Sequence, residues 1–279
     1  MKTIKIDQHP IYANYIELLK GALLNEFGYE NGLRISYLLY CMDTSQPYDL
    51  DHVINIQNYQ PEKIQALRDD PDSQHNYRER MFGFPYSMIG KARLDSLQMM
   101  VETVLREKIP GDFLEAGVWR GGASIFMRAM LELWDDSKRN VYVADSFKGL
   151  PPPKLDQDEN LNFHLDPTLS VSLDVVKSHF ERFGQLNDRV KFMQGWFEDT
   201  LSADEPSQLA ILRADGDLYK STMDILDNLY HRVASGGFVI IDDFGAIASC
   251  RQAVEDFRVA HQINNPIETI DWTGAYWRV

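Results

Sequence analysis

Two pairs of aspartates follow apolar runs in the second half of the chain. The first pair comes after residues 209–212 and the second directly after residues 238–241: Asp215 and Asp217, then Asp242 and Asp243. Carboxylate oxygens are the ligands that hard divalent cations such as Mg²⁺ prefer. If the two runs are neighbouring parallel strands, their ends lie about 5 Å apart, and the carboxylates repel one another unless a cation is bound. Each pair alone is equally explained as a solvated turn or a helix N-cap, so the predicted metal site rests on their occurring together.

A glycine-containing loop and a further acidic residue form a second candidate site. Gly117, Gly121 and Gly122 follow the short apolar run 113–114, and Asp145 ends the run 141–144. Glycines between a strand and a helix let a ligand approach the backbone, and an acid at the end of the second strand can accept from ribose hydroxyls. The spacing departs from GxGxxG, which disfavours a dinucleotide. A tight strand-to-helix turn is the structural alternative for the loop alone.

These residues are placed by a regular alternation of strand-like and helical segments from about Gly111 onward. The expected strands are 113–114, 141–144, 190–193, 209–212 and 238–241, and the expected helices are 123–134, 173–183, 221–233 and 250–261. Strands separated by helices predict an α/β fold with a doubly wound, mostly parallel sheet. Segments 267–271 and 275–279, split by Thr273-Gly274, predict a terminal β-hairpin. In such sheets ligands bind beyond the carboxyl ends of the strands.

The first 85 residues show no such alternation. A helix over 11–27 is expected to bury a stripe made of Ile11, Tyr15, Leu18, Leu19, Ala22 and Leu23. Residues 43–80 are polar and interrupted by prolines, which favours a mobile arm, a cap or an oligomer contact. A further helix is expected over 94–105. We therefore predict an N-terminal helical arm or cap over 1–85, homo-oligomerisation through it, and a catalytic domain over 86–279.

Bulk properties exclude several classes of protein. The 279 residues carry a formal net charge of −14, which argues against a nucleic-acid partner because phosphate binding needs clustered cations. Two cysteines suggest neither a disulfide framework nor a cysteine-rich zinc site. The start, MKTIKIDQHP, lacks the apolar core of a signal peptide, and no apolar stretch approaches the roughly 20 residues of a membrane span. A cytoplasmic protein without a membrane partner is the expectation.

Several motifs together resemble a known family. EAGVWRGGASIFMRAML, VADSFKGLPPP, GWFEDTL, ADGDLYKSTMDIL, GGFVIIDDFGA, CRQAVEDFR and IDWTGAYWR are similar to segments of the macrocin O-methyltransferases, over about residues 85–279. The resemblance implies the class I, Rossmann-like methyltransferase fold with S-adenosylmethionine and Mg²⁺ or a similar ion as cofactors. It also implies methylation of a hydroxyl on a small natural product in antibiotic biosynthesis, on a sugar or a vicinal diol.

The resemblance also assigns residues to the cofactor and the metal. It implies that Glu115 and Gly117 line the methionine and ribose portion of the cofactor, that Asp145 with Ser146 binds the ribose hydroxyls, and that Gly195, Trp196 and Phe197 border the adenine. The segment containing Met88 and Ile89 resembles the one that closes over the methionine end. The implied metal ligands are Asp215, Asp242 and Asp243.

Hydroxyl methylation needs a proton acceptor, because an alcohol is a poor nucleophile at neutral pH. A divalent cation lowers the pKa of a bound hydroxyl, and Asp217 is the best candidate for the general base because Asp-Gly-Asp spacing lets both carboxylates face one cavity. The loop 148–170 is long enough to act as a lid. Its acidic residues, Asp156, Asp158 and Glu159, are equally explained as solvated charges.

Two functions from other classes remain as alternatives. An NAD(P)-dependent oxidoreductase shares the fold class, but it is disfavoured by the glycine spacing and by the lack of a Tyr-x-x-x-Lys pair. A non-catalytic nucleoside-binding protein is disfavoured because both acidic strand ends are intact.

Overall fold

The computed structural model describes residues 6–279. The chain divides into two compact units, one ending at Ala92 and the other beginning at Arg93. The boundary predicted after residue 85 lies shortly before this division, and the roles of the two parts stay a prediction. The first five residues of the MKTIKIDQHP segment lie outside the described part. Within that part, no helix has the length and apolarity to cross a bilayer.

The N-terminal unit is built from helices. They are η1 (Ile6–Gln8), α1 (Pro10–Leu23), η2 (Glu26–Gly28), α2 (Tyr29–Asp43), α3 (Leu50–Ile54), α4 (Ile56–Tyr59), α5 (Pro61–Asp69), η3 (Gln74–Asn76) and α6 (Tyr77–Phe82). The polar segment 43–80, expected to form a mobile arm, a cap or an oligomer contact, is largely helical. Pro61 starts α5 instead of breaking structure, because a first-turn residue has no intrahelical N–H bond to lose. A small core holds this unit together: Tyr29, Leu33, Ile56, Ile64 and Leu67.

Helix α1 confirms the predicted helix but not its predicted buried stripe. Leu19 and Leu23 are buried as expected, whereas Ile11 is 64% and Leu18 60% exposed. The buried face instead includes Tyr12 and Ile16. The helix carries apolar residues on two adjoining stripes, and periodicity alone does not say which stripe meets a packing partner.

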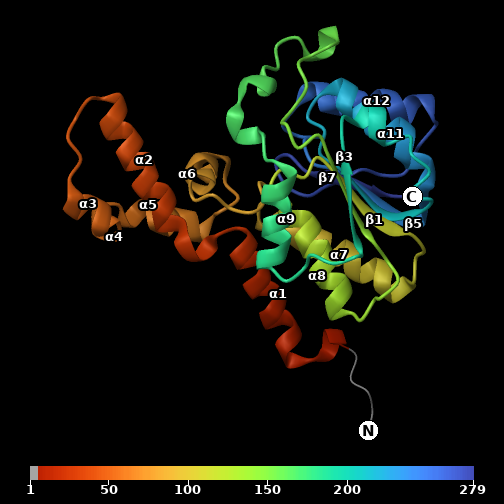
Figure 1. Cartoon of the computed structure of the whole chain (residues 1–279), viewed down its shortest axis with the longest axis horizontal. Helices are drawn as coiled ribbons and strands as arrows, with labels where there is room; N and C mark the ends of the chain where they lie inside the picture. Colours follow the sequence, from red (N-terminus) through yellow and green to blue (C-terminus); the bar gives the residue numbers. More distant parts are fainter. Residues whose placement is uncertain (1–5) are drawn as a thin grey trace. The chain divides into compact units, whose positions relative to one another are not determined.

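The second unit contains a seven-stranded sheet in the order β3-β2-β1-β4-β5-β7-β6 (Figure 1). Its strands are β1 (Asp112–Ala116), β2 (Val141–Asp145), β3 (Val190–Gln194), β4 (Leu209–Ala214), β5 (Val233–Ile241), β6 (Glu268–Thr269) and β7 (Ala275–Arg278). The first five pair in parallel, while β7 pairs antiparallel with both β5 and β6. This order confirms the predicted doubly wound sheet with a terminal hairpin.

Helices cover both faces of the sheet. Helices α11 and α12 lie on one face, and α7, α8 and α9 lie on the other (Figure 1). Their bounds are α7 (Lys91–Glu107), α8 (Gly122–Leu133), α9 (Leu173–Arg182), α11 (Tyr219–Leu229) and α12 (Ala248–Ala260), with the short α10 (Phe197–Thr200) after β3 and η7 (Tyr230–Arg232) after α11. The loop from β2 to α9 contains η4 (Asp156–Asp158), η5 (Phe163–Leu165) and η6 (Pro167–Leu169).

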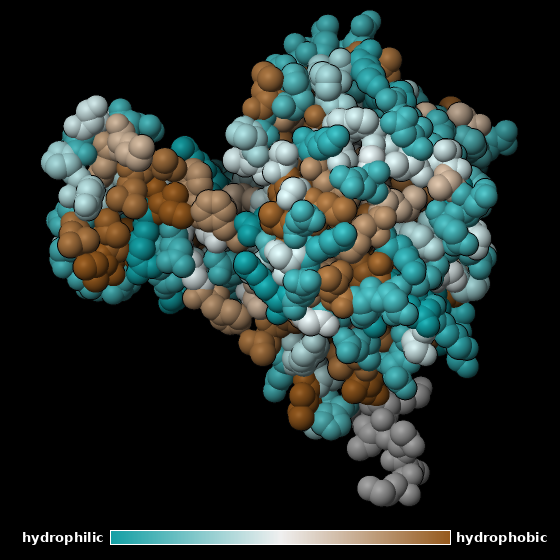
Figure 2. All heavy atoms as spheres, in the orientation of Figure 1, coloured by the Kyte–Doolittle hydropathy of each residue, from teal (hydrophilic) through white to brown (hydrophobic). Residues whose placement is uncertain are grey.

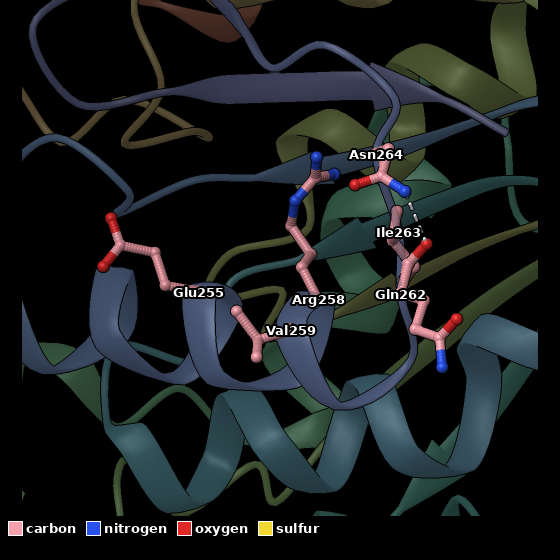
Figure 3. A pocket seen from close by; sticks show the side chains of 6 residues that line it. All are labelled: Glu255, Arg258, Val259, Gln262, Ile263 and Asn264. Atoms are coloured by element: carbon pink, nitrogen blue, oxygen red, sulfur yellow. Dashed lines mark hydrogen bonds between the residues drawn. The ribbon is translucent and has the colours of Figure 1, made fainter.

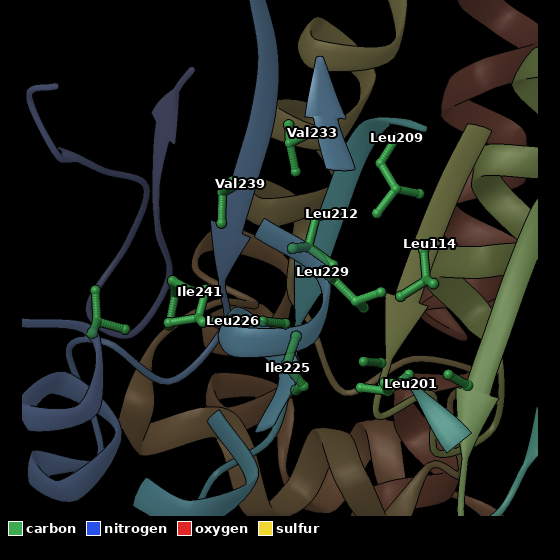
Figure 4. Close-up of a cluster of buried hydrophobic side chains, with 14 of the residues drawn as sticks. Leu114, Leu201, Leu209, Leu212, Ile225, Leu226, Leu229, Val233, Val239 and Ile241 are labelled. Atoms are coloured by element: carbon green, nitrogen blue, oxygen red, sulfur yellow. The ribbon is translucent and has the colours of Figure 1, made fainter. Parts of the chain in front are cut away.

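An apolar core packs against the sheet below its carboxyl edge. Figure 4 shows the apolar side chains packed between the strands and α11, among them Leu114, Leu212, Ile225 and Ile241. All six residues of β4 are buried, as expected for a central parallel strand covered on both faces. Strand β5 begins at Val233, earlier than the predicted residue 238. Val233 already pairs with Leu209 of β4, although the apolar run that marks the strand in the sequence starts only at Phe238.

Candidate active site

Three acidic side chains converge at the carboxyl ends of β4 and β5. The backbone N–H of Asp215 donates to the Ala116 carbonyl (2.8 Å), and that of Asp242 donates to the Ala214 carbonyl (3.0 Å). The parallel hydrogen-bond ladder therefore continues one residue past each strand and holds these residues in register. Carboxylate oxygens of Asp215, Asp242 and Asp243 all lie within 4.8 Å of one another. The structure thus brings together the three side chains predicted as metal ligands.

A buried arginine, which the sequence did not single out, links this cluster to strand β1. Arg213 is only 2% exposed. Its Nη1 lies 2.7 Å from Glu115 Oε1 and 2.9 Å from Asp215 Oδ2, and its Nη2 contacts Asp242 Oδ1. An arginine within a strand-like sequence is usually expected to face solvent. Only the position of β4 between β1 and β5 shows that Arg213 forms buried ion pairs.

Asp242 is held from a second side by α7 and by the terminal hairpin. Arg93 Nη1 donates to Asp242 Oδ2 (2.5 Å), and Arg93 Nε lies 3.1 Å from Asp271 Oδ2. The Thr273 hydroxyl donates to the Asp242 backbone carbonyl (2.8 Å). Asp242 therefore has a fixed orientation, and the two arginines keep its pKa below the ordinary value despite burial.

Asp215, Asp243 and the neighbouring Asp217 lie in surroundings that disfavour their charged forms. Burial and the charge of Asp242 raise the pKa of Asp215 to about 6. The pKa of Asp217 lies well above its ordinary value because of burial and the charges of Asp215, Asp242 and Asp145. The pKa of Asp243 is raised in the same way, by burial and then by the charge of Asp217. The cluster holds more negative charge than Arg93 and Arg213 neutralise.

The donor set fits a hard divalent cation. Asp243 Oδ2 is a buried oxygen without a hydrogen-bond donor in the described part of the chain, and a buried unpaired carboxylate oxygen is costly unless something positive approaches it. Asp242 already accepts from two arginines, but each carboxylate oxygen has a second lone pair. Oxygen ligands from three carboxylates suit Mg²⁺ better than a softer transition metal.

Asp145 ends β2 beside the glycine-containing loop, as predicted. Its Oδ2 accepts from the Val118 N–H (2.8 Å) and its Oδ1 accepts from the Phe147 N–H (2.7 Å). Ser146, predicted to lie alongside it, is buried and donates to the Gly149 carbonyl (2.7 Å). Burial raises the pKa of Asp145, and the backbone donors oppose this effect.

Glu115 and Gly117 serve contacts within the protein. Glu115 is 2% exposed, and its two oxygens accept from Arg213 and from the Ser124 hydroxyl. Burial raises its pKa to about 7. Gly117 has φ +88°, and a Cβ there would stand 1.8 Å from the Asp215 carbonyl oxygen. The close approach that this glycine permits is therefore between the β1 and β4 loops.

The remaining predicted cofactor residues fall in two places. Gly195 follows β3, and its N–H donates to the Asp145 carbonyl (2.9 Å), which brings it to the same edge of the sheet. Trp196 is partly buried, and Phe197 packs against the core beneath the sheet. Met88 and Ile89 belong to the N-terminal unit, where their carbonyls accept from Arg80 (2.8 and 3.2 Å).

A surface pocket lies away from all of these residues. Its volume is about 510 Å³, and it lies at the end of α12, as Figure 3 shows; it is lined by Glu255, Arg258, Val259, Gln262, Ile263 and Asn264. None of the predicted site residues lines it. The chemistry of the acidic edge, and not this pocket, therefore defines the candidate site.

Known proteins are similar to this chain in sequence and in fold. The macrocin O-methyltransferase (TylF) family matches residues 12–279. The 8-demethyl-8-(2,3-dimethoxy-α-L-rhamnosyl)-tetracenomycin-C 4′-O-methyltransferase of Streptomyces olivaceus is 51% identical over 197 residues, covering 69% of this chain and 75% of the relative. The mycinamicin III 3″-O-methyltransferase of Micromonospora griseorubida is 46% identical over 199 residues, covering 69% and 78%. The solved structure of the O-methyltransferase NovP is 34% identical, with a TM-score of 0.76 over 95% of this chain and 98% of that one.

The fold is that of a class I methyltransferase, and the chain is an S-adenosylmethionine-dependent O-methyltransferase. It belongs to the macrocin O-methyltransferase family. The family match begins at residue 12, so it also includes most of the N-terminal unit, which the motifs from residue 85 onward did not cover. The oxidoreductase and the non-catalytic alternatives are set aside.

Proposed function

We propose that this chain methylates a sugar hydroxyl of a glycosylated small natural product and that it requires a divalent cation such as Mg²⁺. The names of two relatives, which specify a rhamnosyl tetracenomycin and a position of mycinamicin III, support the acceptor class. The observation that carries the metal requirement is the convergence of the Asp215, Asp242 and Asp243 carboxylates within 4.8 Å.

In this proposal Asp215, Asp242 and Asp243 hold the cation. Arg213 and Arg93 orient Asp242, and Arg213 also fixes Asp215, so two of the three proposed ligands are held in place without the ion. Such preorganisation by surrounding donors is typical of functional metal sites. When bound, a divalent cation supplies charge stabilisation to a substrate hydroxyl that is losing its proton.

Asp217 is the proposed general base. It follows Asp215 by one glycine, and it stands close enough to Asp215, Asp242 and Asp145 for their charges to raise its pKa. Bound S-adenosylmethionine would supply the methyl group, whose bond to sulfur breaks as its bond to the acceptor oxygen forms, and the Asp217 carboxylate would accept the hydroxyl proton. A carboxylate with a raised pKa is a stronger base than a solvated one.

The cofactor is proposed to lie along the ends of β1, β2 and β3. Asp145 would bind the ribose hydroxyls through the second lone pairs of its oxygens, with Ser146 beside it. Glu115 and Gly117 would shape the methionine side through the loop that they stabilise. The other proposed cofactor residues are Met88, Ile89, Gly195, Trp196 and Phe197.

Turnover of Asp217→Asn tests the proposal. The rhamnosyl tetracenomycin acceptor named for the Streptomyces olivaceus relative and radiolabelled S-adenosylmethionine provide the assay. We expect kcat to fall by about 10²–10⁴-fold while S-adenosylhomocysteine still binds, and we expect EDTA to abolish wild-type turnover. Asp227→Asn, on the exposed side of α11, is the matched control. Near-normal kcat in Asp217→Asn removes this residue from the role of base, and full activity in EDTA removes the cation.

We also propose that the N-terminal part, predicted over residues 1–85, acts as a cap or arm that forms a homo-oligomer contact, next to a catalytic domain over 86–279. Its helices expose large apolar side chains, including Met42 (73%), Leu50 (61%) and Ile54 (58%), and Figure 2 shows hydrophobic atoms gathered on their visible surface. Contiguous exposed apolar surface commonly marks an interaction site. Light scattering should give a mass above that of one chain, and the Met42→Ser/Leu50→Ser variant should lower it. A wild-type monomer would contradict this proposal.

A further inference from the structure

Asp158 differs from the rest of the loop between β2 and α9. The loop is one of the longest connections of the second unit and is drawn in green in Figure 1. The residues on either side of Asp158, from Asp156 to Asn160, are exposed, yet Asp158 itself is 0% exposed. Of the two explanations left open for Asp158, the solvated charge does not hold. A buried carboxylate is retained only where it has strong hydrogen-bond donors.

The donors are the first backbone N–H groups of α11. Asp158 Oδ1 accepts from the Tyr219 N–H (2.7 Å) and Oδ2 accepts from the Lys220 N–H (3.2 Å). The residue at the N-cap position is Leu218, which has no side-chain acceptor and makes no capping bond. First-turn N–H groups lack partners within a helix, and a carboxylate there also opposes the helix dipole favourably. Asp158 therefore caps α11 from a segment about 60 residues earlier in the chain.

The start of α11 determines the backbone of Asp217. Asp217 lies two residues before Tyr219 and has φ +54°, a left-handed conformation that is uncommon for a residue with a side chain. The Leu218 N–H donates to the Gly216 carbonyl across this turn (2.5 Å). A strained turn persists only where its surroundings fix both sides. One side is fixed by the end of β4, and the other by the capped end of α11.

We propose that Asp158 is a positioning residue for Asp217: it pins the 148–170 loop to the start of α11 and thereby sets where the Asp217 carboxylate stands. This inference rests on the proposed function of Asp217 as general base. The loop has a second attachment at its far end, where the Trp119 indole N–H donates to the Thr168 carbonyl (2.9 Å). Asp158 thus attaches the loop to the start of α11, next to the Asp217 turn, and Thr168 attaches it to the glycine-containing loop.

One consequence is that the loop does not open as a single lid. Movement is confined to the stretches between its attachments, while the segment around Asp158 stays with α11. A hinged lid of 23 residues would need to break both hydrogen bonds of the buried Asp158 side chain on every turnover. Acceptor entry therefore leaves the Asp217 turn in place.

The variants Asp158→Asn and Asp158→Ala test this inference, with Asp156→Asn in the same 3₁₀ segment as the exposed control. Three quantities are measured: kcat and KM with the rhamnosyl tetracenomycin acceptor, the Kd of S-adenosylhomocysteine by calorimetry, and the rate of tryptic cleavage after Lys154 in the loop. We expect kcat to fall about tenfold in Asp158→Asn, which keeps one acceptor oxygen, and further in Asp158→Ala. The Kd should stay within twofold, cleavage after Lys154 should be at least tenfold faster, and the control should match the wild type.

The outcomes distinguish a failure of the positioning role of Asp158 from a failure of Asp217 as the proposed base. If Asp217→Asn is inactive but both Asp158 variants keep kcat within twofold of the wild type, the positioning role is wrong and the proposed base stands. If Asp217→Asn is fully active, the proposed base is wrong. Unchanged cleavage after Lys154 overturns the pinned loop whether or not the acceptor is turned over. A joint loss of kcat and S-adenosylhomocysteine binding in the isosteric Asp158→Asn also overturns the inference, because that pattern indicates general unfolding.

Discussion

Replacing Arg213 by methionine removes a buried guanidinium that contacts three carboxylates. Methionine has a similar length and fills most of the same space, so the change isolates the charge. Glu115 and Asp242, which are 2% and 5% exposed, would each lose an ionic partner. Removing one member of a buried ion pair costs about 3–5 kcal/mol because a buried charge is left uncompensated.

This cost predicts a measurable loss of thermal stability. For a unit of this size, 1 kcal/mol corresponds to a Tm change of about 2–4 °C, so the Tm should fall by about 6–20 °C. The matched control is Arg278→Met, because its ion pair with Glu107 is largely exposed and should be worth about 0–1 kcal/mol. Differential scanning calorimetry in EDTA, at pH 6 and pH 8, provides the comparison without an added cation.

The direction of the pH effect follows from Glu115. Its pKa is about 7 in the fold against an ordinary 4.5, and Arg213 is the main influence that lowers it. Without Arg213 the folded-state pKa rises further. A carboxyl with a raised pKa takes up a proton on folding, so stability falls as the pH rises from the unfolded pKa through the folded one. The destabilisation should therefore be larger at pH 8 than at pH 6. A Tm within 2 °C of the wild type at pH 8, or a larger loss at pH 6, would refute this account of the network.

Three further variants probe the site. Asp243→Asn should raise the Tm in EDTA, because it relieves repulsion from Asp217 and Asp215. We expect Mg²⁺ to raise the Tm of the wild type but not that of Asp243→Asn; fluorimetry with and without MgCl₂ measures both effects, and an Mg²⁺ effect retained in the variant would contradict its role as ligand. Gly184→Ala, with φ +67° and open space around it, should cost about 1–2 kcal/mol in urea unfolding from its left-handed backbone alone. Gly117→Ala should cost about 1–3 kcal/mol more than that, because it also has a left-handed backbone and its Cβ meets the Asp215 carbonyl; equal costs would argue against the close approach. Asp145→Asn should weaken S-adenosylhomocysteine binding about 10–100-fold by calorimetry, the effect of losing charge-assisted hydrogen bonds, and an unchanged Kd would exclude the ribose contact.

The positions of the acidic residues could be predicted because strands carry a strong local signal. Apolar runs of parallel strands are buried on both faces, so the residues that end them stand at one edge of the sheet. Asp145, Asp215 and Asp242 each follow such a run, and the structure places each at the end of its strand. The hairpin around Thr273 could also be predicted, because two short strand-like segments flank a turn.

The charges that hold these residues in place could not be predicted from the sequence. Arg93 contacts Asp242 across 149 positions of sequence, and Arg213 stands in a run that resembles any half-buried strand. Asp158 lies in a polar loop where acidic residues are usually solvated, and only the start of α11 reveals its partners. Which stripe of α1 is buried likewise depends on the element that packs against the helix, and the helix's own sequence does not specify that element. Local pattern determines the elements, whereas pairing between distant charges depends on the assembled fold.

The order of the strands has a consequence for how the enzyme is made. The turn of the last hairpin holds the acidic edge: the Thr273 hydroxyl donates to the Asp242 carbonyl, and the Gly245 N–H donates to the Thr273 carbonyl (2.6 Å). Strand β7, the last to be synthesised, pairs with β5 directly beside this edge. A domain generally folds as one unit, so the acidic edge gains this support only once β7 has been synthesised and has paired with β5. A nascent chain would therefore complete its acidic edge only after the terminal hairpin has formed.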